Sequence, residues 1–542
     1  MTSEAAVAVS ASGPTIAAAP QAAPIPWLGI AAVLLGTFIS TLTGRLSTFG
    51  LADIRGAVHA GFDEGAWIST AQTTAQMLIT PVAVWAGSIY GTRRILLAAC
   101  MVFATVELIL PLSPNLPTLL ALQFVAGLGS GCFIPLTLSF ILARMPRHLW
   151  SYAVAVYGLN IELSTHISAS LEGWYVDHAS WRWIFWQNVP LAIAMAACLH
   201  FGIRVAQPRL APPKPDIFGL TAFGVGLALI YAALDQGNRL DWLNSGLVRG
   251  LLLGGAVMLT AFYVHARRTP NSWIDLRVAL TLPLPILLVL VALLRWAVLS
   301  TSFLVPQFLG GVRGFRTLEV GDTLVWVALP QLLLAPLAGF MLRFVDPRVV
   351  AAFGLSCIGA ACLIVAFGLT PLWGSEQFLP SQLLQAAGQS MALTGVILTS
   401  VLHLRLETAL TFGAMVQSAR LFGGELGQAF ISTFQRIREQ RASNLIGLHV
   451  QAGDDRVIHR LQAYGRVVTR IGHADSHGAA ATSLLGRVVR NMATTQSVID
   501  SYVALGTIAV TGLLVLTLLN APPGAPPSLR KLLFGRNRVG TA

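Results

Sequence analysis

Long apolar stretches recur along this chain and set the strongest limit on its fold. A helix of about 20 apolar residues crosses the hydrocarbon core of a bilayer. By that measure we expect fourteen membrane-spanning helices grouped as six, two and six, near 27–50, 66–89, 94–112, 118–142, 151–175 and 183–203, then 217–235 and 247–266, then 284–308, 322–342, 349–370, 380–403, 411–433 and 500–520. The predicted fold class is therefore all-α transmembrane.

The charge content agrees with a membrane location. Only 11% of the 542 residues are charged and 55% are hydrophobic, whereas soluble domains carry about 25% charged residues. The formal net charge is +12, but Lys and Arg are scattered between the apolar stretches and form no run typical of a nucleic-acid patch. We therefore expect the lipid bilayer, and no nucleic acid, as a partner.

The distribution of Lys and Arg predicts the orientation, because short cytoplasmic loops are enriched in positive charge. With both termini cytoplasmic, the inner loops and the C-terminal tail hold 17 Lys or Arg residues and the short outer loops hold six. An even number of spans is required for this arrangement. We therefore predict a multi-pass protein with both termini in the cytoplasm.

The rest of the chain divides into two tails, a central linker and one insert. Residues 1–25 are rich in Ala, Pro and Ser and lack the Lys or Arg of a signal peptide. The predicted organisation is a disordered cytoplasmic tail at 1–25, a six-helix bundle at 26–206, two linker helices at 207–270, five helices of a second bundle at 271–433, a periplasmic insert at 434–499, the last span at 500–520 and a cytoplasmic tail at 521–542.

The insert at 434–499 is polar and too long for a simple turn. Within it apolar residues recur at helical spacing, with arginines elsewhere around the helix: Val457, Ile458, Leu461, Tyr464, Val468 and Ile471. This pattern predicts an amphipathic helix that packs on the mouth of the protein, lies on the lipid surface or docks a partner. Its histidines are spaced too irregularly to predict a metal site.

The sequence carries no motif for catalysis. There is no P-loop, so ATP is not the expected energy source. Neither H-E-x-x-H nor G-x-S-x-G occurs, and the five cysteines lie in apolar segments without zinc-ligand spacing. We expect no enzyme activity, no cofactor and no metal.

Ionisable side chains deep within the predicted spans are the candidates for function, because charge is costly in hydrocarbon. They are Arg45, Glu107, Glu162, His166, Arg295, Arg420 and Glu425. Glu162 and His166 are four residues apart on one helix face. We predict that this pair holds an exchangeable proton, with Arg45 close by; the alternative is a static polar link between helices.

The other candidates each have two interpretations. Arg295 keeps its charge at any ordinary pH, so it binds an anionic substrate or pairs with an acid. Arg420 and Glu425 are five residues apart on different faces, so each is expected to pair with another helix. The small-residue pairs Gly127/Gly131 and Gly423/Gly427 predict close helix contacts. Possible cavity aromatics, with packing or lipid anchoring as the alternative, are Trp27, Tyr157, Phe303, Trp326 and Phe412.

Three strings carry a family resemblance. WRWIFWQNVP (181–190), ALDQGNRLDWLNSGLV (233–248) and ARLFGGELGQA (419–429) resemble the helix 5–6 junction, the loop between the two extra central helices, and helix 13 of the fourteen-helix drug/proton antiporters of the EmrB/QacA type, in the major facilitator superfamily. Arg420 stands at that family's helix 13 Arg. The resemblance covers roughly 26–520 and implies two six-helix bundles with two extra central helices.

Several family positions are replaced. Thr43 stands at the acid of helix 1, Ser88 at the Asp of the cytoplasmic gating motif, and Gln123 at the Arg of helix 4. The antiporter motif of helix 5 is reduced to SASLEG at 168–173. The gating loop keeps Gly91, Arg93 and Arg94.

The resemblance implies a secondary transporter of the bacterial inner membrane that exports small amphipathic or aromatic compounds, driven by inward proton flow. In the EmrB branch such a transporter works with a periplasmic adaptor and a TolC-like outer-membrane channel. The replaced positions keep two alternatives open. One is a facilitator or symporter for an anion attracted by Arg45 and Arg295, and the other is a membrane scaffold or sensor that no longer transports.

Overall fold

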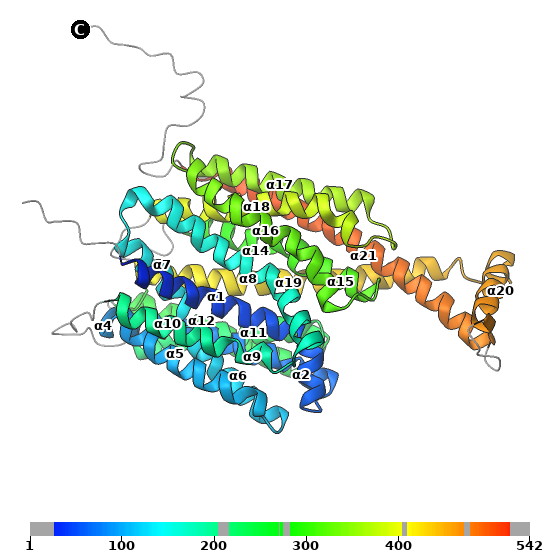
Figure 1. The fold of residues 1–542 in the computed structure, drawn as a ribbon, viewed down its shortest axis with the longest axis horizontal. Coiled ribbons are helices and arrows are strands. Elements are labelled where there is room, and N and C mark those ends of the chain that lie inside the picture. Colours follow the sequence, from blue (N-terminus) through cyan, green and yellow to red (C-terminus); the bar gives the residue numbers. More distant parts are fainter. Residues whose placement is uncertain are drawn as a thin grey trace, which may run out of the picture.

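The computed structural model describes residues 26–203, 216–269, 272–274, 282–403, 409–451, 453–470 and 477–520. The elements in these ranges are helices (Figure 1), and they form two bundles. The first contains α1 (Trp27–Phe49), the short α2 (Leu51–Ala57) and α3 (Phe62–Gly65), α4 (Trp67–Tyr90), α5 (Thr92–Ile109), α6 (Leu116–Ser130), α7 (Phe133–Arg144), α8 (Trp150–His178), α9 (Trp183–Trp186) and α10 (Asn188–Gly202).

The linker and the second bundle follow. The linker helices are α11 (Ile217–Gly237) and α12 (Gly246–Arg268). The second bundle contains α14 (Leu284–Ser302), α15 (Leu304–Gly311), α16 (Thr317–Met341), α17 (Pro347–Gly368), α18 (Ser375–Leu402), α19 (Ala409–Gly447), α20 (Asp455–Arg470) and α21 (His477–Thr517). The predicted tails at 1–25 and 521–542 lie outside the described residues.

Ten helical segments within the described ranges are long and apolar enough to cross a membrane. Four further long helices, α4, α8, α18 and α19, lie among them but are more polar. Each carries buried polar side chains, such as Gln72 and Gln76 on α4 and Gln385 and Gln389 on α18. The predicted number of fourteen spans stays a prediction, because composition alone supports ten.

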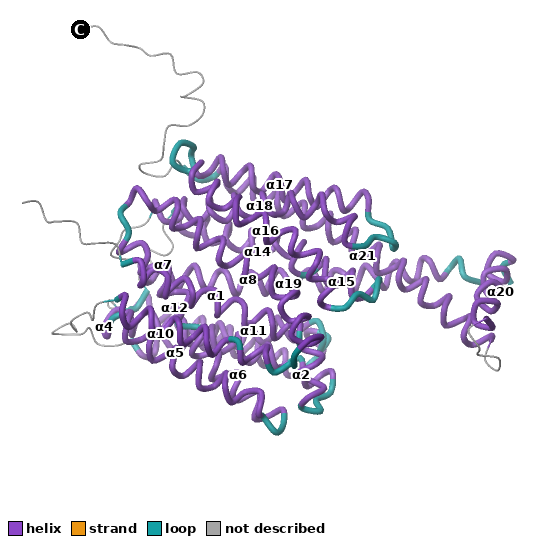
Figure 2. Tube along the Cα trace, in the orientation of Figure 1, coloured by secondary structure: helices purple, strands orange, loops and turns teal. Residues whose placement is uncertain are grey.

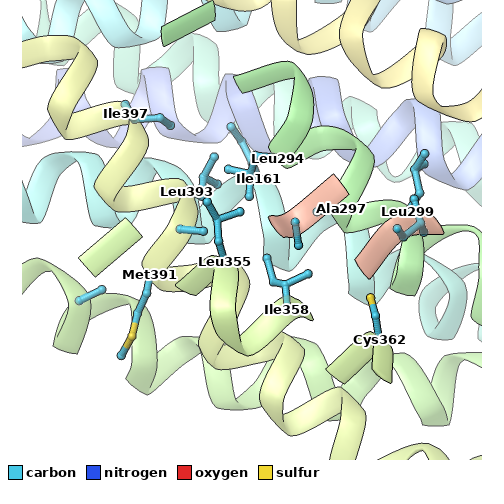
Figure 3. Close-up of a cluster of buried hydrophobic side chains, with 14 of the residues drawn as sticks. Ile161, Leu294, Ala297, Leu299, Leu355, Ile358, Cys362, Met391, Leu393 and Ile397 are labelled. Carbon is cyan, nitrogen blue, oxygen red and sulfur yellow. The ribbon is translucent and has the colours of Figure 1, made fainter. Parts of the chain in front are cut away.

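The two bundles pack most closely along α8 and α16. A Cβ added to Gly173 on α8 would lie 2.5 Å from the backbone nitrogen of Leu318, and one added to Gly321 on α16 would lie 2.5 Å from the Ser170 hydroxyl. Figure 3 shows Ile161 of α8 beside Leu294 and Leu393 of the second bundle, within one buried apolar cluster. This seam fixes the bundles to each other on one side of the molecule.

The linker helix α11 packs against both bundles. A Cβ added to Gly224 would lie 2.7 Å from the Leu78 carbonyl oxygen on α4. Met77 of α4, Leu227 of α11 and the neighbouring Leu421 of α19 belong to one apolar cluster. The hydroxyl of Thr433 on α19 accepts a hydrogen bond of 3.0 Å from the Trp242 indole in the loop after α11. The linker is thus part of the interface between the bundles.

Asp216 holds the start of α11. Its carboxylate accepts hydrogen bonds from the Gly219 N–H (2.9 Å), His265 Nε2 on α12 (2.7 Å) and the Trp273 N–H (3.3 Å). Burial acts to raise the pKa of Asp216, but these hydrogen bonds outweigh it and hold the pKa below its usual value. One carboxylate therefore ties both linker helices to the segment that leads into the second bundle.

The predicted insert is a helical hairpin. α19 and α21 continue well beyond the other helices and carry α20 at the tip, as Figures 1 and 2 show. Arg438 Nε and Asp500 Oδ2 form an ion pair of 2.5 Å between the two long helices. The amphipathic α20 packs on α21, with Val457 buried. The last helix begins at His477, well before the predicted 500, and the insert projects away from the bundles.

Candidate functional site

A polar cavity lies between the bundles. Five helices line it: α1, α4, α11, α14 and α19. Its volume is about 170 Å³. The lining residues are Ser40, Thr41, Gly44, Arg45, Thr48, Ser69, Gln72, Thr73, Gln76, Tyr231, Asp235, Arg295, Leu299, Arg420, Leu421, Gly424, Glu425 and Gln428.

The cavity lies toward the end of the molecule that bears the hairpin. Its residues fall in the second half of α1, α11 and α14 and in the first half of α4, and α1 runs toward the hairpin end (Figure 1). Toward the opposite end α19 meets α7, where a Cβ on Gly413 would lie 2.5 Å from the Pro135 carbonyl oxygen. This contact closes the space beneath the cavity.

Three arginines from three helices converge on the cavity: Arg45 of α1, Arg295 of α14 and Arg420 of α19. Within the described part of the chain none of them has a carboxylate within 4.0 Å. Arg420 Nε donates to Gln417 Oε1 at 3.0 Å, whereas Arg295 Nε and Nη1 are buried without a partner. The carboxylate of Glu162 lies within electrostatic reach of all three.

Two carboxylates lie on the α11 and α19 side of the same cavity. Asp235 accepts hydrogen bonds from the Thr70 hydroxyl and, at 3.2 Å, from the Gln236 amide. Glu425 is 7% exposed and interacts with Asp235 and Tyr231 across the gap between the helices. The predicted partner of Glu425 on another helix is thus a second acid, and Arg420 and Glu425 line one cavity without pairing to each other.

Glu162 and His166 do not line this cavity. The ring of His166 is fully buried, with Nδ1 2.8 Å from the Glu162 backbone oxygen and 3.9 Å from its carboxylate. His166 Nε2 lies 3.1 Å from the hydroxyl of Thr301 on α14, which also accepts from Gln389 of α18 at 3.0 Å. The pair is therefore close in space, as predicted, and belongs to a polar chain that joins α8 to the second bundle.

The direction of the Thr301 hydroxyl is linked to the protonation state of the His166 imidazole. A carbonyl oxygen only accepts, so Nδ1 must donate to Glu162. If the Thr301 hydroxyl donates to Nε2, the imidazole is neutral. If it donates instead to the Val298 carbonyl at 3.0 Å, Nε2 must donate and the ring is charged. The chain can therefore accommodate either protonation state by rotating one hydroxyl.

The remaining predicted residues are spread through the fold. Gln123 on α6 is fully buried and both its amide atoms lack a partner. Gly91 ends α4 with a φ of 87° and Arg93 Nη2 lies 3.3 Å from His200 Nδ1, while Arg94 is exposed. The aromatics are outside the cavity lining: Trp27 and Trp326 are 62% and 47% exposed, and Tyr157, Phe303 and Phe412 pack in the core.

Asp235 and Tyr231 were missed by sequence reasoning. Asp235 is the last residue of the predicted span 217–235 and lies within the string 233–248 that resembles a loop, where an acid needs no explanation. In the structure α11 continues to Gly237 and presents both side chains to the cavity. The available signal was their spacing, because residues four apart share one helix face.

Comparisons with known proteins agree with this architecture. The model of the Major Facilitator Superfamily matches residues 33–428. The Probable multidrug resistance protein EmrY of Escherichia coli (strain K12) is 26% identical over 356 residues, 66% of this chain and 68% of that protein. The Fatty acid resistance protein FarB of Neisseria gonorrhoeae is 22% identical over 427 residues, 77% of this chain and 82% of that protein.

Solved structures share the fold at low identity. The human organic anion transporter MFSD10 aligns with a TM-score of 0.53 at 14% identity, over 91% of this chain and all of that chain. The proton:xylose symporter XylE aligns with a TM-score of 0.56 at 11% identity, over 91% and 96% of the two chains. Together with the family model they confirm the predicted all-α fold of two bundles.

Proposed function

The chain belongs to the Major Facilitator Superfamily and is a multi-pass membrane transporter rather than an enzyme; from that premise we propose that it exports small amphipathic compounds from the cytoplasm in exchange for protons. The observation that carries the proposal is the charged cavity between the bundles, lined by both bundles and by α11. Relatives named as multidrug export proteins support the direction of transport.

The cavity has the form that alternating access requires. A transporter of this kind binds its substrate between two bundles and opens to one side at a time. Here the lining residues lie toward the hairpin end, while Gly413 and Pro135 are in contact at the other end. We propose that the hairpin end faces the periplasm of a bacterial inner membrane, so this arrangement faces outward.

We propose two places for the coupling proton. Asp235 and Glu425 face the cavity and each other, and two neighbouring carboxylates share protons because their mutual repulsion opposes ionisation of both. Tyr231 of α11, the guanidinium of Arg45 and that of Arg239 act on the same pair. Glu162 and His166 stay the second candidate, since their polar chain crosses from α8 to α14 and α18 of the second bundle.

Efflux of a fluorescent amphipathic dye from bacteria that overproduce the protein tests the function. Wild type is expected to lower the intracellular dye, and an uncoupler is expected to abolish this. Uncoupler-insensitive movement down the dye gradient would select a facilitator instead. No dye efflux in either condition, with the protein present in the membrane, would contradict the proposed substrate class.

Matched carboxyl-to-amide variants separate the two proton sites. Glu425→Gln and Asp235→Asn are expected to abolish uncoupler-sensitive efflux if the cavity pair carries the proton. Glu162→Gln and His166→Ala test the other pair, and intact coupling in both would remove it. Glu107→Gln is the control, because Glu107 is buried on α5 beside Asn188, outside the cavity lining.

We further propose that the hairpin of α19, α20 and α21 docks a periplasmic adaptor, which in turn meets a TolC-like outer-membrane channel. The hairpin projects from the bundles (Figure 1), and its helix α20 has the exposed charged side chains Arg456 and Arg460. Replacing 445–485 by a short flexible linker is expected to abolish co-purification with an adaptor. Unchanged co-purification, with the shortened protein still folded, would contradict the proposal.

A further inference from the structure

The three arginines of the cavity are not explained by the contacts that they make. A charge within a bilayer is costly and is normally paired or exposed to a water-filled space. Within the described ranges, Arg45, Arg295 and Arg420 have no carboxylate within 4.0 Å. Among the described residues, the only side-chain hydrogen bond from these three arginines runs from Arg420 Nε to Gln417.

Arg295 gives the clearest sign of a missing partner. Its Nε and Nη1 atoms are buried and neither donates a hydrogen bond to a described residue, although a buried donor without an acceptor is rare in folded proteins. Arg295 also lines the cavity. Guanidinium N–H groups are directional donors that match the oxygens of a carboxylate. An oxyanion in the cavity would supply the acceptors.

The nearby carboxylates balance the charge of the arginines at a distance but do not accept hydrogen bonds from them. Glu162 is on α8, which does not line the cavity, and its Oε2 atom has no hydrogen-bond partner among the described residues. Asp235 is held by Thr70 and Gln236 on the α11 side of the cavity. Glu425 faces Asp235 and Tyr231. The cavity therefore has three arginines, contributed by α1, α14 and α19, and a pair of acids, contributed by α11 and α19.

We propose that Arg45, Arg295 and Arg420 bind the anionic head group of the exported compound, so that the substrates are amphipathic organic acids. The cavity of about 170 Å³ suits a carboxylate head group with its first carbon atoms. Leu299 and Leu421, beside the arginines, offer apolar contact for the start of the tail. This inference rests on the proposed function only in taking the cavity as the substrate site.

Equilibrium binding of three probes with one chain length tests the inference. Octanoate, octylammonium and octanol are titrated onto the purified full-length protein in lipid nanodiscs. The readout is the thermal unfolding midpoint, followed with a thiol-reactive dye that reaches the buried Cys100, Cys132 and Cys362 only on unfolding. Octanoate is expected to raise the midpoint saturably, whereas the ammonium and the alcohol are not. An equal or larger effect of octylammonium would overturn the inference.

Arginine variants assign the effect to the cavity. Arg45→Gln, Arg295→Gln and Arg420→Gln are each expected to raise the half-saturating octanoate concentration about tenfold or more, because a charged hydrogen-bond donor is lost. Arg295→Lys keeps the charge and is expected to lie between. Arg436→Gln is the control, because Arg436 is on α19, as Arg420 is, but pairs with Asp241 outside the cavity.

The outcomes separate this inference from the proposed function. Octanoate binding that is unaffected by all three glutamine variants would overturn the inference even if dye efflux is proton-coupled. Octanoate binding that depends on the arginines would support it even if uncouplers leave dye efflux unchanged, because the binding assay contains no proton gradient. A variant that unfolds before the titration is replaced by its lysine counterpart, for which the same two results decide.

Discussion

Gly413 on α19 should control which side of the membrane reaches the cavity. A methyl group at this position would lie 2.5 Å from the Pro135 carbonyl oxygen on α7, well inside van der Waals contact. Both atoms belong to or are fixed by helix backbones, so α19 and α7 must separate in Gly413→Ala. The contact lies toward the end opposite the hairpin, so the substitution disfavours the arrangement in which α19 and α7 are packed together there.

The size of the effect follows from the overlap. Overpacking by one methyl group costs about 1–3 kcal/mol. If the clash is relieved in the inward-facing arrangement, this energy shifts the ratio of the two arrangements by about 5- to 150-fold. Gly44→Ala is the matched control, because Gly44 also lines the cavity but has no atom within 4 Å of an added Cβ.

Accessibility of a cysteine in the cavity measures the shift. Thr41→Cys is introduced into a protein whose five native cysteines are replaced by alanine, and a membrane-impermeant thiol reagent is applied to right-side-out and inside-out vesicles. Gly413→Ala is expected to increase the labelling rate from the side opposite the hairpin and to lower it from the hairpin side, with Gly44→Ala unchanged. Rates for Gly413→Ala that match those of Gly44→Ala would refute the reasoning.

Substitutions at three positions outside the cavity test local contacts of the fold, each followed by thermal unfolding with the thiol-reactive dye. Asp216→Ala is expected to lower the free energy of unfolding by about 2–3 kcal/mol, because the cap of α11 and the hydrogen bond to His265 are both lost. Asp216→Asn keeps the cap and is expected to lower it by about half as much. An equal loss of stability in both variants would contradict this assignment. Because the pKa of Asp216 is lowered in the folded state, its contribution is present above the unfolded pKa of about 3.9 and is lost as pH falls through the folded pKa, so the gap between wild type and Asp216→Asn should close only in strong acid. Asn188→Ala removes the 3.0 Å hydrogen bond to the buried Glu107 and is expected to cost about 1–3 kcal/mol; no change in the midpoint would mean that Glu107 finds another partner. Gly91→Ala forces a side chain into a φ of 87° and is expected to cost about 1–3 kcal/mol, whereas a midpoint equal to that of Gly44→Ala would show that the loop relaxes freely.

Much of the fold follows from local pattern. The predicted pairs of small residues are confirmed as close contacts: a Cβ on Gly127 would lie 2.2 Å from the Gln72 carbonyl oxygen, and one on Gly423 would lie 2.6 Å from the Ala292 side chain. Such contacts depend on residue size and helix periodicity, which the sequence displays directly. The hairpin shows where prediction from local pattern fails. Its polar sequence indicates where the chain leaves the hydrocarbon core, but it does not show that α19 and α21 continue as helices beyond that point.

The site is harder to predict because convergence depends on how distant helices pack. The spacing of Glu162 and His166 is a property of one helix and appears in the sequence, and the two side chains do lie within 3.9 Å. The meeting of Arg45, Arg295 and Arg420 joins three helices separated by more than 100 residues each, and nothing local encodes it. The same holds for Asp235 and Glu425, which meet only because α11 packs between α4 and α19.

The polarity of whole helices is nevertheless a signal in the sequence, which a search for apolar spans ignores. The four long helices that are too polar to qualify by composition are α4, α8, α18 and α19. Two of them, α4 and α19, line the cavity, and the other two contribute His166 and Gln389, which both contact Thr301 of α14. A helix keeps buried polar residues in a bilayer only where neighbouring helices or a wet cavity satisfy them. In a transporter bundle, low hydropathy in a long helix is therefore evidence of buried polar groups between helices, and here it selects the helices that carry Glu162, His166, Arg420 and Glu425.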